Sequence, residues 1–199
     1  MHSRRSPVDA TWRDRMRANT LGAKYLAVAA FLATFAAVLV MVMRTDSAPA
    51  HTGQGAAAAL IQPVVALVAL TGIVALMMVV YRNIAVIRGA ASERYFRAFT
   101  DDRPAEWIER PARAYMNLLE LPVLFYVACL FMLASGRFDA VQVSLAWLFV
   151  ITRYVHAFIY IGFNHVPLRF AAFLAGAVTL ALIWTRFAEQ SLGMGPALK

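Results

Sequence analysis

The run from Ala56 to Tyr81, 26 residues without a charged side chain, constrains this chain more than any other feature. About 20 apolar residues in a helix are enough to cross the roughly 30 Å hydrocarbon core of a bilayer. Hydrophobic residues make up 61% of the chain and charged residues 15%, whereas a soluble domain has about 45–50% and about 25%. A chain of 199 residues cannot hide that much apolar surface within itself. This composition excludes a disordered protein and disfavours a water-soluble one, and we expect lipid to cover part of the molecule.

Four further apolar runs have the length of a membrane span. The first is the uncharged run Tyr25–Met43, and the others, at about 107–134, 139–163 and 167–187, contain a few charged residues. No stretch alternates with the period of two that is typical of strands. The first run, at 19 residues, is longer than the 7–15 apolar residues of a signal peptide, which predicts a retained helix. The sequence thus predicts an all-α integral membrane protein with five spans.

The spans divide the chain into one added helix and a four-helix domain. A segment after Met43 that contains Pro49, Gly53 and Gly55 is interpreted as a linker between the two. The predicted division is a basic N-terminal segment at 1–24, an extra transmembrane helix at 25–43, an external linker at 44–57, a four-helix membrane domain at 58–187 and an external tail at 188–199.

Basic residues predict the orientation of these spans. Six lie in residues 1–24, seven lie between Arg82 and Arg113, and Arg169 adds one, against four on the opposite side. By the positive-inside rule, the N-terminus is cytoplasmic and the C-terminus external. This asymmetry explains the net charge of +8 without a nucleic-acid partner, and we expect the basic loop to contact anionic lipid headgroups.

Polar and charged residues inside the spans follow two stripes. One contains Arg110, Arg113, Asn117 and Glu120, spaced 3, 4 and 3; the other contains Arg153, His156 and Tyr160, spaced 3 and 4, with Arg169 nine residues further on. Such spacings place each set on one face of a helix. A charged group at the bilayer centre costs about 2.5–3.5 kcal/mol on insertion scales, so the stripes should face protein, paired or functional.

Two interpretations of the stripes stand at this point. In the first they form a structural ion-pair network, with Glu120 paired to Arg113 or Arg153 and His156 satisfied in the core. In the second they converge on a ligand pocket. Several arginines and one carboxylate suit an anion that also carries an ammonium group, and a cation beside a thiol stabilises the thiolate. Glutathione fits this set, as do other amphipathic anions.

The complete spacing set resembles the MAPEG family, the membrane-associated proteins in eicosanoid and glutathione metabolism. The resemblance covers roughly residues 60–187. The sequence motifs Glu120-Leu-Pro-Val and Asn164-x-Val-x-x-Arg169 are similar to those of a bacterial branch of the family. The resemblance implies a four-helix bundle assembled as a homotrimer in a bacterial inner membrane, with glutathione as cosubstrate between subunits near the cytoplasmic face. Residues 25–43 are an addition to this core. We expect this added helix to bind a helix of a partner protein.

The resemblance also implies roles for individual residues. Arg169, which would stabilise the glutathione thiolate, and Tyr160 are the expected catalytic residues. The expected glutathione-binding residues are Arg110, Arg113, Asn117, Glu120, Arg153, His156 and one arginine after the first core helix, Arg88 or Arg82. This sequence departs from the family pattern at two positions: Met116 stands where some animal members have arginine, and Phe170 stands where one branch has serine. The substrates of the animal enzymes are therefore not carried over to this protein.

Three functions compete. The leading hypothesis is a glutathione-dependent transferase or peroxidase acting on lipophilic electrophiles or lipid hydroperoxides; the alternative is a non-enzymatic structural or accessory subunit of a membrane complex with the same fold. A transporter or proton relay is disfavoured because the sequence has no internal repeat. We expect no metal, since His156 and His165 are nine residues apart, and no catalytic role for Cys129 in its apolar surroundings.

Overall fold

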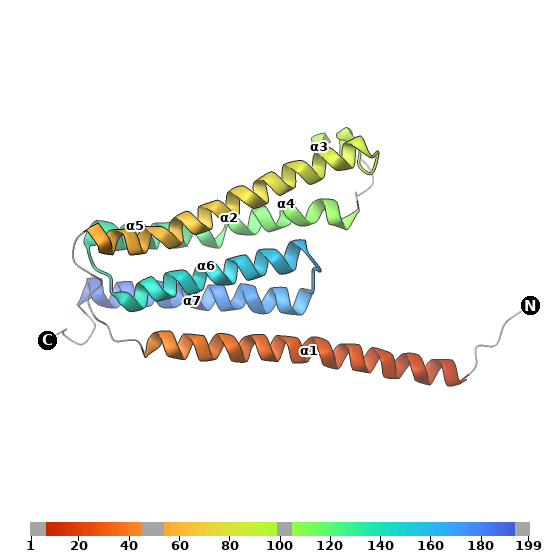
Figure 1. Cartoon of the computed structure of the whole chain (residues 1–199), viewed down its shortest axis with the longest axis horizontal. Helices are drawn as coiled ribbons and strands as arrows, with labels where there is room; N and C mark the ends of the chain where they lie inside the picture. The colour runs from red at the N-terminus through yellow and green to blue at the C-terminus, as the bar shows by residue number, and fades with distance from the viewer. Residues whose placement is uncertain (1–6, 45–53, 99–104, 194–199) are drawn as a thin grey trace, which may run out of the picture.

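The computed structural model describes residues 7–44, 54–98 and 105–193, and all of its regular elements are helices (Figure 1). They are α1 (Pro7–Met43), α2 (Gln54–Ile87), α3 (Glu93–Ala98), α4 (Glu106–Leu118), α5 (Leu121–Ser135), α6 (Ala140–Ile161) and α7 (Val166–Leu192). Five segments are long and apolar enough to cross a membrane, with α4 and α5 forming one segment together. The predicted all-α architecture with five spans is therefore confirmed.

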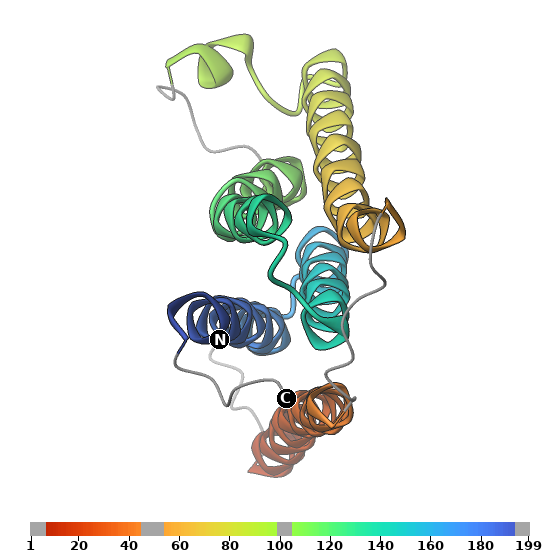
Figure 2. The same cartoon turned by 90° about the vertical axis from the view of Figure 1, so that its left-hand side faces the viewer.

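The helices pack side by side with α6 near the middle. Helix α6 contacts α7 on one side and α2 and α4 on the other, while α1 packs against α7 and α6 at the edge of the bundle (Figure 2). The turn between α6 and α7 and the turn between α5 and α6 lie at opposite ends of the bundle (Figure 1). We call these the Arg169 end and the Asp139 end.

Buried apolar side chains hold the bundle together, and small residues bring α7 close to α6. The rings of Phe125 and Phe149, both fully buried, stack with centroids 4.8 Å apart. Small residues on α7 are buried along the helix: Ala171, Ala172, Ala175, Gly176 and Thr179. Small side chains allow two helix backbones to approach closely in a membrane. Cys129 is also buried in this core, as its apolar neighbours indicated.

The third predicted span is interrupted, where the sequence interpretation took 107–134 as one run. Helix α4 ends at Leu118, and α5 begins at Leu121 with Pro122 in its first turn. A proline has no N–H to donate and its ring clashes with the carbonyl four residues earlier, which breaks the helix. Glu120 lies at the break as the N-cap residue of α5, with φ −94° and ψ −89°.

Several other predicted boundaries differ in extent. Helix α1 begins at Pro7, so the segment 7–24 is helical as well as the apolar run, because a helix need not end where hydrophobicity ends. Helix α2 begins at Gln54, inside the predicted linker, and α7 continues past Phe187 to Leu192. The rest of that linker (45–53) and the tail from 194 onward lie outside the described residues.

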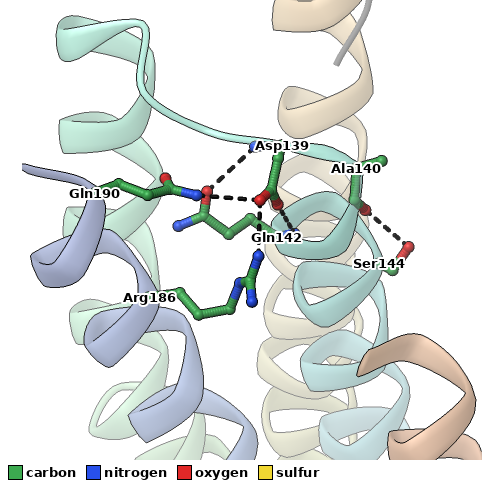
Figure 3. Close-up of polar contacts among 6 residues, drawn as sticks. All are labelled: Asp139, Ala140, Gln142, Ser144, Arg186 and Gln190. Carbon is green, nitrogen blue, oxygen red and sulfur yellow. Dashed lines mark hydrogen bonds and ion pairs between the residues drawn. The ribbon is translucent and has the colours of Figure 1, made fainter. Parts of the chain in front are cut away.

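A polar cluster joins the helices at the Asp139 end (Figure 3). Asp139 caps α6: its Oδ1 accepts from the Gln142 N–H at 2.9 Å, and the Gln142 side chain accepts from the Asp139 N–H. Asp139 Oδ2 also accepts from Arg186 at 2.7 Å and from Gln190 at 3.1 Å, both on α7. The start of α6 is thereby tied to the end of α7.

Candidate functional site

Three residues of the predicted site meet at the Arg169 end, where α6 stops and α7 starts. The guanidinium carbon of Arg169 lies 4.1 Å from the centroid of the Tyr160 ring, a cation–π distance. The His156 ring lies 5.9 Å from the Tyr160 ring. Tyr160 and His156 are buried, at 8% and 5% exposure, and Arg169 is half-buried. The structure thus brings together His156 and Tyr160 of the second stripe with Arg169 beyond the turn.

The tautomer of the neutral His156 ring follows from its hydrogen bond. Its Nδ1 lies 3.1 Å from the backbone oxygen of Arg169. A carbonyl oxygen can only accept, so Nδ1–H donates, and Nε2 of the neutral ring is left as an acceptor. Nε2 is buried and has no hydrogen-bond partner within the described part of the chain. In the neutral ring, Nε2 is therefore a buried acceptor without a partner near the Arg169 cation.

Arg153 lies deepest in the stripe, at 1% exposure. Its Nη2 donates to the backbone oxygens of Ala172 and Phe173 at 3.2 and 3.1 Å, and its guanidinium carbon lies 5.3 and 5.6 Å from the Phe149 and Phe173 ring centroids. Its Nε and Nη1 have no partner in the part of the chain that the structure covers. Carbonyl dipoles and ring faces, not a carboxylate, stabilise this buried charge.

Arg110 is occupied by contacts within the chain. Its Nε donates to Glu106 Oε1 at 3.3 Å, one turn earlier on α4, and its Nη1 donates to the backbone oxygen of Gly162 at 2.8 Å. Gly162 follows the last residue of α6. Arg110 therefore fastens α4 to the α6–α7 turn.

The rest of the first stripe faces outward. Arg113 and Glu120 are exposed, and Asn117 is half-buried with its amide donating to the Arg113 backbone oxygen at 2.9 Å. No ion pair or hydrogen bond among the described residues joins these three to the group around Arg169. The two ion pairs that this part of the chain contains are Arg110–Glu106 and Arg186–Asp139. The expected pairing of Glu120 with Arg113 or Arg153 therefore does not form within the single chain.

The two arginines after the first core helix have different surroundings. Arg88 follows the end of α2 and is exposed. Arg82 is half-buried, and its guanidinium carbon lies 5.2 Å from the Phe96 ring centroid of α3. Arg82 thus docks α3 onto α2, and Arg88 is the freer of the two cations.

Two further residues contribute at this end, Glu106 and Asn164; Asn164 belongs to a motif of the family resemblance, but neither residue was assigned a role in the predicted site. The Asn164 amide donates to Glu106 Oε1, and its oxygen accepts from Arg169 Nη1 at 2.6 Å. Glu106 lies four residues before Arg110, a spacing that pairs charges on a helix, so a local signal for it existed. No periodic pattern marked Asn164. The described residues hold no group of three or more His, Cys, Asp or Glu side chains suited to a metal ion.

The helical spans and the charged residues within them define an integral membrane protein with a polar site at one end of its bundle. A sequence model of the MAPEG family matches residues 60–188, which is more than half of the chain. This protein therefore belongs to the MAPEG family, whose members are membrane proteins of glutathione-related transferase and peroxidase chemistry. No curated protein and no solved structure matches the chain significantly. The family prediction is confirmed, and the match leaves α1 outside the family domain.

Proposed function

We propose that this protein is a glutathione-dependent transferase or peroxidase that acts on lipophilic electrophiles or lipid hydroperoxides within the membrane. The observation that carries the proposal is the state of Arg169. Its guanidinium is fixed over the Tyr160 ring and hydrogen-bonded to a neutral amide, and no ion pair with a carboxylate forms within the described residues. A fixed cation without a counter-ion is suited to stabilise a thiolate.

The other residues of the site fit the remaining groups of glutathione. Exposed Arg113 suits a carboxylate, and Glu120 suits an ammonium group. The free acceptor Nε2 of His156 suits a thiol or ammonium proton. Arg153 adds positive charge from inside the bundle, and Tyr160 holds Arg169 in place. Bound glutathione would supply a nucleophilic sulfur for attack on an electrophilic carbon or a peroxide oxygen.

Assembly as a homotrimer is part of this proposal. Glu120 lies inside the span Glu106–Ser135, exposed and without an ion pair in the single chain. A charge facing lipid at that depth is costly. A neighbouring subunit that covers Glu120, Asn117 and Arg113 removes this cost and completes a pocket. The count of basic residues supports an orientation with the Arg169 end in the cytoplasm and Arg88 near the headgroups. The motifs similar to a bacterial branch support placement in a bacterial inner membrane.

The test is glutathione binding by detergent-purified protein, with thiolate absorbance followed as a function of pH. We expect saturable binding, a thiol that ionises at lower pH than free glutathione, and loss of this shift in Arg169→Ala. Arg44→Ala is the matched control, since Arg44 is an exposed arginine that follows α1 at the opposite end of the bundle. If Arg169→Ala leaves thiolate formation unchanged, the mechanism is wrong.

The same experiment addresses the alternative of a non-enzymatic accessory subunit. Helix α1, which lies outside the family domain and exposes apolar side chains such as Leu26 and Met41, is the observation that favours it. Absence of binding at millimolar glutathione, together with loss of the trimer in Glu120→Gln by native mass spectrometry, would support that function instead.

A further inference from the structure

The turn between α6 and α7 depends on an unusual residue. Asn164 is the one non-glycine residue with positive φ, at 46°, among those the structure describes. Asparagine enters this left-handed region more readily than other side chains, apart from glycine. The Asn164 N–H donates to the Ile159 backbone oxygen at 2.8 Å, which fixes the backbone of the turn. The side chain is thereby aimed between α4 and α7.

The Asn164 amide uses both of its ends. Its Nδ2 donates to Glu106 Oε1 on α4, and its Oδ1 accepts from Arg169 Nη1 on α7 at 2.6 Å. A primary amide can donate and accept while remaining uncharged. A carboxylate at this position would accept from Arg169 equally well, but it would also neutralise the arginine.

The Glu106 carboxylate is itself held in place. It accepts from Arg110 Nε at 3.3 Å, and Arg110 Nη1 donates to the Gly162 oxygen at 2.8 Å. Helix α4 therefore contacts the turn twice, once through Glu106 and Asn164 and once through Arg110 and Gly162. The position of Arg169 is linked to α4 by this closed set of contacts.

We propose that Asn164 is a positioning residue for Arg169: it transmits the position of Glu106 to the guanidinium, holds it on the Tyr160 ring and leaves its charge uncompensated. The part of this proposal that concerns the thiolate rests on the proposed function. The part that concerns the position of Arg169 stands without it. A purely structural role for the turn would affect stability but not the reactivity of Arg169 in the folded protein.

The first test measures the rate at which phenylglyoxal modifies Arg169 in the detergent-purified full chain without glutathione, followed by peptide mass spectrometry. Asn164→Gly keeps the left-handed turn accessible and removes the side chain. We expect modification to be faster by roughly tenfold, the equilibrium factor of one charge-assisted hydrogen bond. Glu106→Ala should also accelerate it, whereas Glu106→Gln, which keeps an acceptor oxygen, should not. Asn83→Ala, which removes an exposed asparagine on α2, is the matched control.

Combining the variants tests transmission through Asn164. If Glu106 acts on Arg169 through this amide, Glu106→Ala adds nothing in the Asn164→Gly background. Modification of Arg169 at the wild-type rate in Asn164→Gly, or simple additivity of the two changes, would overturn the proposal. Glu106 is exposed, so its variants should fold even if the turn variant does not.

The second test uses the thiolate. Asn164→Asp keeps an acceptor for Arg169 but cannot donate to Glu106, so it is combined with Glu106→Gln, whose amide can donate to the new carboxylate. In this background Asn164→Asp should protect Arg169 from phenylglyoxal, yet it should remove the shift in glutathione ionisation because the new carboxylate neutralises the cation. An unchanged shift in Asn164→Asp contradicts the charge argument alone. If the wild type binds no glutathione, the proposed function fails, and the phenylglyoxal rates still decide whether Asn164 positions Arg169.

Discussion

Replacing Gly176 with alanine should destabilise the bundle because the added Cβ would crowd two buried side chains. Gly176 lies on α7 against the buried Arg153 guanidinium. A Cβ at this position would come 2.7 Å from Arg153 Cζ and 2.8 Å from Thr152 Oγ1. Both neighbours are buried, at 1% and 3% exposure, and Arg153 is held by two backbone carbonyls and two rings. The guanidinium would therefore have to give up some of these contacts in order to move.

The magnitude follows from a comparison with Gly72 on α2, where an added Cβ meets nothing within 4 Å. Glycine inside a helix costs about 0.5–1 kcal/mol relative to alanine, and both variants gain this amount. The difference between them is then the overpacking cost, about 1–3 kcal/mol. If Arg153 also loses its carbonyl contacts, each lost hydrogen bond to the charged group adds about 1.5 kcal/mol or more.

The assay is thermal unfolding of both variants in the same detergent. For a chain of this size each 1 kcal/mol corresponds to roughly 2–4 °C. We expect Gly72→Ala at or above the wild-type Tm and Gly176→Ala clearly below it. In an Arg153→Met background, which removes the guanidinium, Gly176→Ala should lose most of its cost. Equal stability of Gly176→Ala and Gly72→Ala would refute the close packing of Arg153 against α7.

Three further predictions concern other parts of the molecule. Asp139→Ala should lower the free energy of unfolding by about 2–4 kcal/mol, because it removes a helix cap and leaves Arg186 without its carboxylate; chemical denaturation measures this. Tyr160→Phe should leave the phenylglyoxal rate of Arg169 unchanged, whereas Tyr160→Leu should raise it, because the ring face and not the hydroxyl contacts the cation. Deleting residues 1–44 should leave glutathione binding intact, since α1 packs at the edge of the bundle; loss of binding would place this helix in the site.

Local patterns in the sequence were enough for the architecture. Long apolar runs predicted the five spans, and the four-helix family domain from residue 60 onward was implied by the family resemblance of the polar motifs. Length and periodicity are properties of a single helix, so they can be read without knowing what that helix packs against. The break at Leu119 and Glu120 was also encoded locally, by Pro122, although the apolar run continues across it.

Spacing placed Arg110, Arg113 and Asn117 together on α4, but Glu120 of the same stripe lies at the break before α5. Spacing also could not tell which members of the two stripes meet. His156, Tyr160 and Arg169 come together, whereas Arg113 and Glu120 point outward and Arg110 is used within the chain. The reason is that each helix face is defined by sequence alone, while its rotation toward a neighbour is set by packing against several helices at once.

The sequence by itself determined that this chain lies in a membrane, how many times it can cross and which residue types line one face of each helix. Only the tertiary structure decided how Arg169 is held. That arrangement depends on the left-handed backbone of Asn164 and on the approach of Glu106 from α4, 58 positions earlier in the chain. Side-chain contacts across such a separation depend on the backbone dihedrals of the turn and on helix packing. Hydrophobic periodicity describes one face of one helix, so it predicts neither of them.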